Sequence, residues 1–201
     1  VLAIEYAIAQ RQALGIDVIN LSLGHPIYEP AARDPLVRAV ENAVDAGIVV
    51  VVSAGNVGRN LETREIGYAG LTSPGNAPSA ITVGSLNTKG TETRSDDEVA
   101  PYSSRGPTWY DAFAKPDLVA PGHRLVSEFS KHSTLYTQLA SSLIAENSNK
   151  PNMMMMSGTS MATGVTSGVV ALMIEANRHA SVQVGTDNRL SPNAVKAMLQ
   201  F

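Results

Sequence analysis

The sequence predicts an α/β protein whose mostly parallel β-sheet is flanked by helices, and three observations support this fold class. An apolar segment at Ile16–Leu23 is followed by a helical pattern and then by the β-branched run Ile48–Val52. Continuous β-branched runs are typical of strands that are buried on both faces of a parallel sheet. A strand, a helix and a second strand in succession form a βαβ unit, so these two strands are expected to be parallel.

A helix is expected to open the chain and to end at Gly15. Four apolar residues share one face of this helix: Ile4, Ala7, Ile8 and Leu14. Because the chain begins and stops inside helical patterns that lack capping residues, we interpret it as a piece of a longer protein. The alternative is a mature protein whose terminal helices fray.

The helix between the two apolar segments has a signal at each end. Asp34 is a preferred N-cap residue, and Pro35 after it suits the first helical position. Gly47 comes directly before the β-branched run and is expected to end the helix.

The second half of the chain continues the pattern. Ala80–Gly84 is expected to form a short strand, Met161–Arg178 a helix rich in small residues, and Ser191-Pro192 the start of a final helix. Residues 127–153 are mostly polar and are predicted to be an inserted loop with some helical character. We find no internal repeat and no second domain.

Composition excludes several classes of protein. With 201 residues the chain is one domain or a large part of one. The net charge of −3 does not favour binding to nucleic acid or to an anionic membrane surface. Apolar runs are far shorter than the ~18 residues of a transmembrane helix. The absence of cysteine excludes thiol chemistry, cysteine zinc sites and disulfides.

Polar residues follow two predicted strands, and a serine begins the later helix. The first two turns are Ser22-Leu23-Gly24-His25 and Ser53-Ala54-Gly55-Asn56. Ligands of open α/β sheets bind beyond the carboxyl ends of the strands. Ser160, at the start of its helix, is placed near free backbone N–H groups that suit a nucleophile generating an oxyanion. Taken singly, such a serine is usually a cap, and an asparagine after glycine is usually a turn residue.

Together, six motifs in order resemble the subtilisin-like serine proteases, or subtilases. The nucleophile motif is SGTSMAT at Ser157–Thr163. Five others precede it: VINLSLG (Val18–Gly24), VVVSAGN (Val50–Asn56), SPGNAPSAITVG (Ser73–Gly84), YSSRGPT (Tyr102–Thr108) and KPDLVAPG (Lys115–Gly122). The resemblance covers nearly the whole chain and implies a subtilisin-like three-layer sandwich that is truncated at its N-terminus.

The resemblance also implies the roles of individual residues. Ser160 is the acyl-forming nucleophile, and the side-chain amide of Asn56 donates to the oxyanion hole. Substrate-binding positions implied by the motifs are Ser22, Leu23, Gly24, Ser53, Ala54, Gly55 and, on the pocket floor, Thr72. The first segment pairs with the substrate backbone as an added strand, and the family's bond at Ser73-Pro74 is often cis.

The chain departs from the family pattern in ways that affect activity. The family's aspartate motif and its His-Gly-Thr-His motif lie upstream of every segment seen here, so the general base and its orienting carboxylate are missing. The four histidines, His25, His123, His132 and His179, are interpreted as surface or loop residues, with His25 nearest to the expected cleft. Gly164 stands where the family commonly has proline, which should loosen the nucleophile helix.

The sequence thus predicts a serine endopeptidase that hydrolyses peptide bonds through an acyl-enzyme on Ser160, while this chain alone is expected to be inactive. The alternative is a non-catalytic peptide-binding or structural module of the same fold. An esterase of another fold would require Gly-x-Ser-x-Gly, which differs from the Gly-Thr-Ser-Met-Ala found here.

Cofactors, partners and location follow from the same resemblance. No cofactor is required for the chemistry, and no metal site is predicted. Subtilases often bind structural calcium, but Asp96-Asp97-Glu98 lacks the spacing of a calcium loop and is interpreted as a solvated turn. Met153–Met156 is interpreted as an apolar strand. The expected partner is a peptide or protein substrate outside the cytoplasm, and an unpaired sheet edge would favour self-association.

Overall fold

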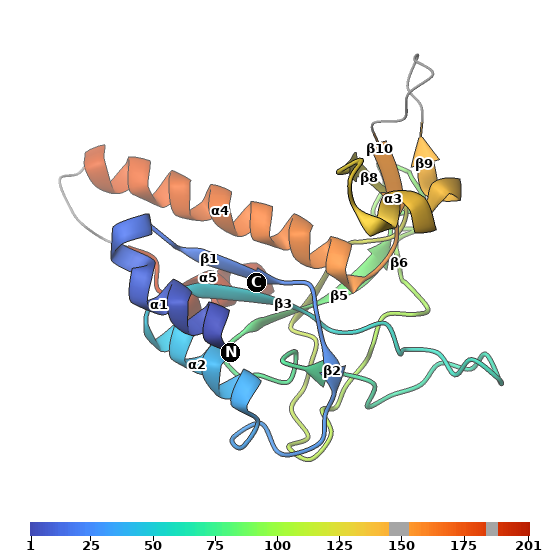
Figure 1. Cartoon of the computed structure of the whole chain (residues 1–201), viewed down its shortest axis with the longest axis horizontal. Coiled ribbons are helices and arrows are strands. Elements are labelled where there is room, and N and C mark those ends of the chain that lie inside the picture. Colours follow the sequence, from blue (N-terminus) through green and yellow to red (C-terminus); the bar gives the residue numbers. More distant parts are fainter. Residues whose placement is uncertain (145–152, 184–188) are drawn as a thin grey trace.

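The computed structural model describes residues 1–144, 153–183 and 189–201. A central sheet carries α1 (Leu2–Leu14) and α2 (Pro35–Asp45) on one face (Figure 1). The other face packs against α4 (Thr159–Gln183) and α5 (Pro192–Gln200). The predicted three-layer α/β arrangement is confirmed.

The central sheet is mostly parallel, as predicted. Its parallel strands lie in the order β1 (Val18–Leu21), β3 (Val49–Ser53), β5 (Ile81–Asn87) and β7 (Leu118–Pro121). The short β6 (Glu98–Val99) pairs antiparallel with the end of β5. In the described part of the chain β1 pairs with β3 alone, so its other edge is unpaired.

The β-branched run explains how the sheet is covered on both sides. Val50 and Val52 pack into the apolar core that α1 and α2 form, whereas Val49 and Val51 pack into the core that α4 and α5 form. Side chains alternate between the faces of a strand, so a strand with two apolar faces needs an uninterrupted apolar sequence.

Both predicted ends of α2 are present. The Asp34 carboxylate accepts hydrogen bonds from the N–H groups of Leu36 (2.8 Å) and Val37 (3.3 Å). Its second oxygen accepts from the Ser73 hydroxyl at 2.6 Å, which links the start of α2 to β4 (Thr72–Ser73). Gly47 has φ of 85°, which favours glycine at the end of a helix.

Two predictions for the first segments are wrong in detail. The first strand is Val18–Leu21, shorter than the expected Ile16–Leu23, because the chain leaves the sheet at Ser22, which hydrogen-bonds to α4. Leu14 does not share the buried face of α1; it lies in the last turn and is 60% exposed, while Ile4 is buried.

The polar segment after residue 124 is more regular than predicted. It forms an antiparallel sheet in the order β8 (Leu125–Glu128), β10 (Met153–Met156) and β9 (Leu143–Ile144). A short helix, α3 (Thr134–Gln138), and the 3₁₀ turn Ala140–Ser142 connect β8 to β9. The methionine run is a strand, as expected. Part of the predicted insertion, residues 145–152, lies outside the described residues.

Helix α4 runs without a break from Thr159 to Gln183, so the predicted loosening at Gly164 is not seen. By length and composition its Thr159–Ala180 portion could cross a membrane, which the short apolar runs did not predict. In this fold, however, one face of α4 packs against the sheet through residues such as Ala162 and Val170. This packing against the sheet is typical of a helix in the core of a fold.

Candidate active site

The polar turns after β1 and β3 meet the N-terminus of α4, as the resemblance implies. Gly55 in the turn after β3 donates its N–H to the Thr159 hydroxyl at 3.2 Å. In the turn after β1, the Ser22 hydroxyl donates to the Ser160 carbonyl at 2.9 Å. Three segments far apart in the sequence are therefore joined at one edge of the sheet.

Ser160 is half-buried and lies in the first turn of α4. Backbone N–H groups in the first turn of a helix have no carbonyl partner within that helix, and the helix dipole is positive there. The Ser160 hydroxyl donates to the Ser22 carbonyl at 3.4 Å. Its proton is therefore directed at a carbonyl oxygen, which is a very weak base.

The side chain of Asn56 contacts Thr159, the residue before Ser160, and this contact sets its orientation. Asn56 Oδ1 accepts from the Thr159 N–H at 2.9 Å and from the Thr159 hydroxyl at 3.1 Å. A backbone N–H can only donate, so the side-chain oxygen must face Thr159 and the NH₂ group must point away. Among the described residues no hydrogen bond uses Asn56 Nδ2, which leaves this donor free at the site.

The predicted walls of a substrate pocket lie close together. Ser53 donates its hydroxyl to the Leu23 carbonyl at 3.3 Å, which joins the two turns. Ala54 is fully buried, and its carbonyl accepts from the N–H (3.2 Å) and the hydroxyl (3.4 Å) of Thr72. The Ser73–Pro74 bond next to Thr72 is cis, as predicted.

The side chain of Thr72 fills the space between the two walls. A methyl group added at Gly24 would lie 2.5 Å from Thr72 Oγ1, and one added at Gly55 would lie 2.9 Å from Thr72 Cγ2. Both glycines are therefore needed for the close approach of Thr72. Gly55 also has φ of 104°, a backbone conformation that other residues rarely adopt.

None of the four histidines, all of which are described, lies within hydrogen-bond distance of the Ser160 hydroxyl. His25 bonds through its Nδ1 to the Pro26 carbonyl at 2.7 Å and stacks on Tyr28. His179 contacts Glu175 at 2.9 Å, one turn away on α4. The interpretation of the histidines as surface or loop residues agrees with these contacts.

The acidic residues 96–98 do not converge on a common point. Asp96 accepts from the Thr91 hydroxyl at 2.9 Å, and Glu98 pairs with Lys89 at 2.7 Å. Across the described ranges, no group of three or more histidine, aspartate or glutamate residues is arranged to hold a metal ion.

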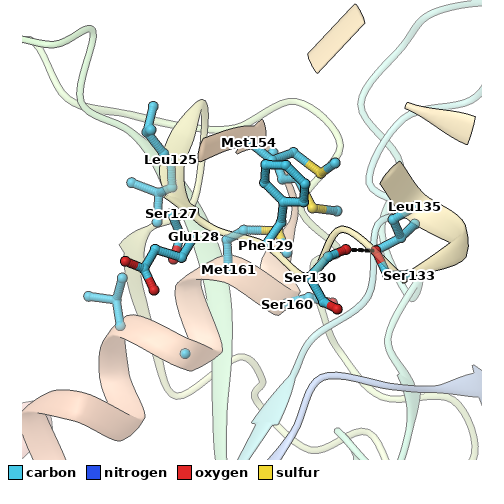
Figure 2. Close-up of a pocket in the computed structure, with 14 residues that line it drawn as sticks. Leu125, Ser127, Glu128, Phe129, Ser130, Ser133, Leu135, Met154, Ser160 and Met161 are labelled. Carbon is cyan, nitrogen blue, oxygen red and sulfur yellow. Dashed lines mark hydrogen bonds between the residues drawn. The ribbon is translucent and has the colours of Figure 1, made fainter. Parts of the chain in front are cut away.

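Two parts of the site were not predicted. Thr159 orients Asn56, and only its place inside the Gly-Thr-Ser motif could have drawn attention to it. A cavity of about 730 Å³ also lies beside Ser160, between α4 and the β8–β10 sheet (Figure 2). Its lining comes largely from the polar segment, whose composition gave no signal for a pocket.

A serine hydroxyl at a helix N-terminus and a free amide donor near it, at the edge of a parallel α/β sheet, are one part of the arrangement found in serine hydrolases; the described residues supply no base to Ser160. The model of the subtilase family matches residues 2–200. The chain is 40% identical over 187 residues to serine protease AprX of Bacillus subtilis, covering 92% of this chain and 37% of AprX. It is 36% identical over 119 residues to subtilisin E of the same organism, covering 59% of this chain and 24% of that protein.

Solved structures agree with these sequence relationships. Sphericase matches with a TM-score of 0.67 at 25% identity, over 99% of this chain and 53% of sphericase. A cold-adapted subtilisin-like serine proteinase matches with a TM-score of 0.56 at 28% identity, over 91% of this chain and 46% of that one. The chain belongs to the subtilase family of serine proteases, and it spans about a quarter to a half of the length of these relatives.

Proposed function

We propose that the protein containing this chain is a serine endopeptidase that cleaves peptide bonds through an ester on Ser160. The arrangement of Asn56 beside Ser160 carries the proposal. Its amide oxygen is held by Thr159, so its NH₂ group is free to donate to negative charge that develops next to the Ser160 hydroxyl.

In the proposed reaction, Ser160 Oγ attacks the carbonyl carbon of the scissile peptide bond. The carbonyl oxygen becomes an oxyanion that accepts hydrogen bonds from Asn56 Nδ2 and from the Ser160 N–H. The serine proton passes to a histidine base and then to the leaving amine, so that the C–N bond breaks and an ester remains. Water then hydrolyses the ester by the reverse proton path.

The acyl half of the peptide is proposed to lie along the two turns after β1 and β3. Ser22, Leu23 and Gly24 are exposed beyond the end of β1 and can accept a peptide as an added strand. Ser53, Ala54 and Gly55 would form the opposite wall of the pocket for the side chain that precedes the scissile bond. Because Thr72 lies between the walls, this pocket is shallow and favours small side chains.

The base and its orienting carboxylate are proposed to come from an upstream segment outside residues 1–201. The structure offers two surfaces for that segment to cover. One is the unpaired edge of β1, and the other is an apolar stripe on α4 in which Val165, Val169 and Leu172 are 37%, 41% and 71% exposed. Among the described residues the Ser160 hydroxyl bonds only to the Ser22 carbonyl, so the chain without this segment is proposed to be inactive.

A non-catalytic peptide-binding module remains the second candidate, because no histidine contacts Ser160 in the part of the chain that the structure describes. Both candidates take a peptide or protein as partner, and neither needs a cofactor. A location outside the cytoplasm and self-association of the truncated chain remain predictions from the resemblance.

The test compares residues 1–201 with the same chain extended by its natural upstream segment, here called the extended chain. Cleavage of an unfolded protein substrate is expected for the extended chain and not for residues 1–201. Ser160→Ala in the extended chain should abolish cleavage. Full activity in the Ser160→Ala variant would contradict the proposed nucleophile, and peptide binding without cleavage by the unchanged extended chain would favour the second candidate.

A further inference from the structure

The motif YSSRGPT (Tyr102–Thr108) takes no part in the proposed reaction, but its first residues lie against the turn that carries Asn56. The Gly58 N–H donates to the Tyr102 carbonyl at 2.9 Å. Ser104, two residues further on, is fully buried and contacts the same turn before and after Asn56. A segment that is distant in sequence therefore holds this turn in place.

Ser104 holds the two peptide groups that flank the Cα atom of Asn56. Its N–H donates to the Gly55 carbonyl at 2.9 Å, and this carbonyl belongs to the peptide group that precedes Asn56. Its hydroxyl accepts from the Val57 N–H at 3.1 Å, and this N–H belongs to the peptide group that follows Asn56. Because peptide groups are planar, the backbone of Asn56 can turn only about φ and ψ, and holding both planes fixes both angles.

The backbone of Asn56 depends on these contacts with its neighbours. Asn56 is exposed, and in the part of the chain that the structure describes its own N–H and carbonyl make no hydrogen bond. The fit around Ser104 is close, because a methyl group added at Gly55 would lie 2.9 Å from Ser104 Oγ. Close packing of this kind leaves the turn little freedom to shift.

We propose that Ser104 is a positioning residue for the oxyanion hole, which sets the backbone of Asn56 while Thr159 orients the side-chain amide. The inference rests on the proposed function and adds to it a residue that acts only through Asn56. An oxyanion donor is effective only at hydrogen-bond distance from the oxygen on which the charge develops. A misplacement of about 1 Å can cost on the order of 10²-fold in rate, so the turn that carries the donor must be held firmly.

The neighbouring serine provides a matched control for a purely structural role. Ser103 is as fully buried as Ser104, and its hydroxyl also accepts from a backbone N–H. That N–H belongs to Ser85 of β5, at 3.0 Å, and not to the turn that carries Asn56. Loss of either hydroxyl leaves a backbone N–H without its partner, but only the loss at Ser104 frees a peptide group next to Asn56.

The test is a double-mutant cycle in the extended chain, with kcat and KM measured on a peptide substrate. Ser104→Ala is expected to lower kcat about tenfold and to change KM by less than about twofold, because the amide acts in the transition state. In an Asn56→Ala background the same change should lower kcat by less than about twofold, because the group that Ser104 positions is already absent. Ser103→Ala is expected to lower the midpoint of thermal unfolding while kcat stays within about twofold.

Titration of Ser160 with a fluorophosphonate counts the folded enzyme in each variant, so that kcat refers to active molecules only. If Ser104→Ala does not fold, Ser104→Cys replaces it in the cycle. Cysteine fills the same space with a weaker acceptor and should lower kcat about threefold, again only when Asn56 is present.

A kcat for Ser104→Ala within about twofold of the unchanged extended chain would overturn the inference. An equal loss of kcat with and without the Asn56 side chain would also overturn it, because Ser104 would then act on another part of the site. Full activity of Asn56→Ala is a different outcome, because it rejects the proposed oxyanion donor. Absence of cleavage by the unchanged extended chain rejects the proposed function itself, and the inference with it.

Discussion

Thr159 holds the side-chain oxygen of Asn56 with both its backbone N–H and its hydroxyl, at 2.9 and 3.1 Å. This double contact fixes which end of the amide faces the neighbouring nucleophile. An amide that donates without a titratable proton suits an oxyanion, because its charge state does not change with pH. In the proposed reaction, the residue before Ser160 therefore orients the residue that stabilises the oxyanion.

Asn56→Ala in the extended chain is expected to lower kcat by roughly 10²–10³, the range known for this kind of truncation in subtilisin, with a smaller change in KM. The reason is that the amide acts on charge present only in the transition state. Steady-state kinetics with a peptide substrate provide the measurement. A kcat within threefold of the unchanged enzyme together with a raised KM would identify Asn56 as a binding or turn residue.

Thr159→Val removes the hydroxyl that holds Asn56 Oδ1 but retains the backbone N–H and the shape of the side chain. A drop in kcat of about tenfold, with KM nearly unchanged, is expected because the amide loses one of two contacts that orient it. Thr159→Ser keeps the hydroxyl and is the matched control. If both variants lost activity equally, the threonine methyl group rather than its hydroxyl would matter.

Thr72→Gly is expected to deepen the pocket for the side chain that precedes the scissile bond. With the Thr72 side chain gone, the gap between Gly24 and Gly55 opens, so kcat/KM for peptides with phenylalanine at this position should rise about tenfold relative to alanine. Thr72→Val keeps the volume and should retain the preference for small residues. An unchanged preference in Thr72→Gly would place the pocket elsewhere.

A buried charge cluster links α5 to the sheet and predicts a pH dependence of stability. Lys115 Nζ lies 2.7 Å from Asp117, and Lys196 of α5 lies 3.0 Å from the other oxygen of that carboxylate. Burial lowers the pKa of the Lys115 ammonium to about 8, with Lys196 adding repulsion, although Asp117 opposes the shift. In the unfolded chain the Lys115 ammonium has its ordinary pKa of 10.5.

Between pH 8 and about 10.5 the unfolded state therefore binds more protons at Lys115 than the folded state does. The free energy of unfolding should rise with pH across this window, by a few kcal/mol at most. In Lys115→Met this contribution should disappear, whereas Lys131→Met, a change at an exposed lysine, should retain it. Chemical denaturation of the extended chain at several pH values provides the measurement, and identical slopes in all three proteins would contradict the assigned cause.

The sheet and its covering helices could be predicted because local and tertiary signals agree there. The valines of the β-branched run Val49–Val52 pack alternately into the apolar cores on the two faces of the sheet. The Asp34 side chain caps the start of α2, and the positive φ of Gly47 follows its end. The exposure of Leu14 could not be predicted, because helical periodicity assigns a residue to one face of the helix but does not tell how far along the helix that face is covered by other elements.

The motifs named the candidate site residues one by one, but they did not predict the contacts among them. The motifs named Ser160 and Asn56, while the role of Thr159 depends on a hydrogen bond across 103 positions in sequence. The cavity was missed for a related reason. Phe129 and Leu135 stand alone in a polar segment, and only the pairing of β8 with β10 brings them to Met154 and Met161.

The most direct test of the account is the reaction of Ser160 with a fluorophosphonate, followed by intact-mass analysis. A serine hydroxyl has a high pKa, and its reactivity depends on a base within hydrogen-bond reach. Residues 1–201 alone are expected to remain unlabelled, and the extended chain should take up one equivalent that Ser160→Ala abolishes. Stoichiometric labelling of Ser160 in residues 1–201 would contradict the account, because it would require a base within this chain, and His25→Ala would then be the first variant to examine.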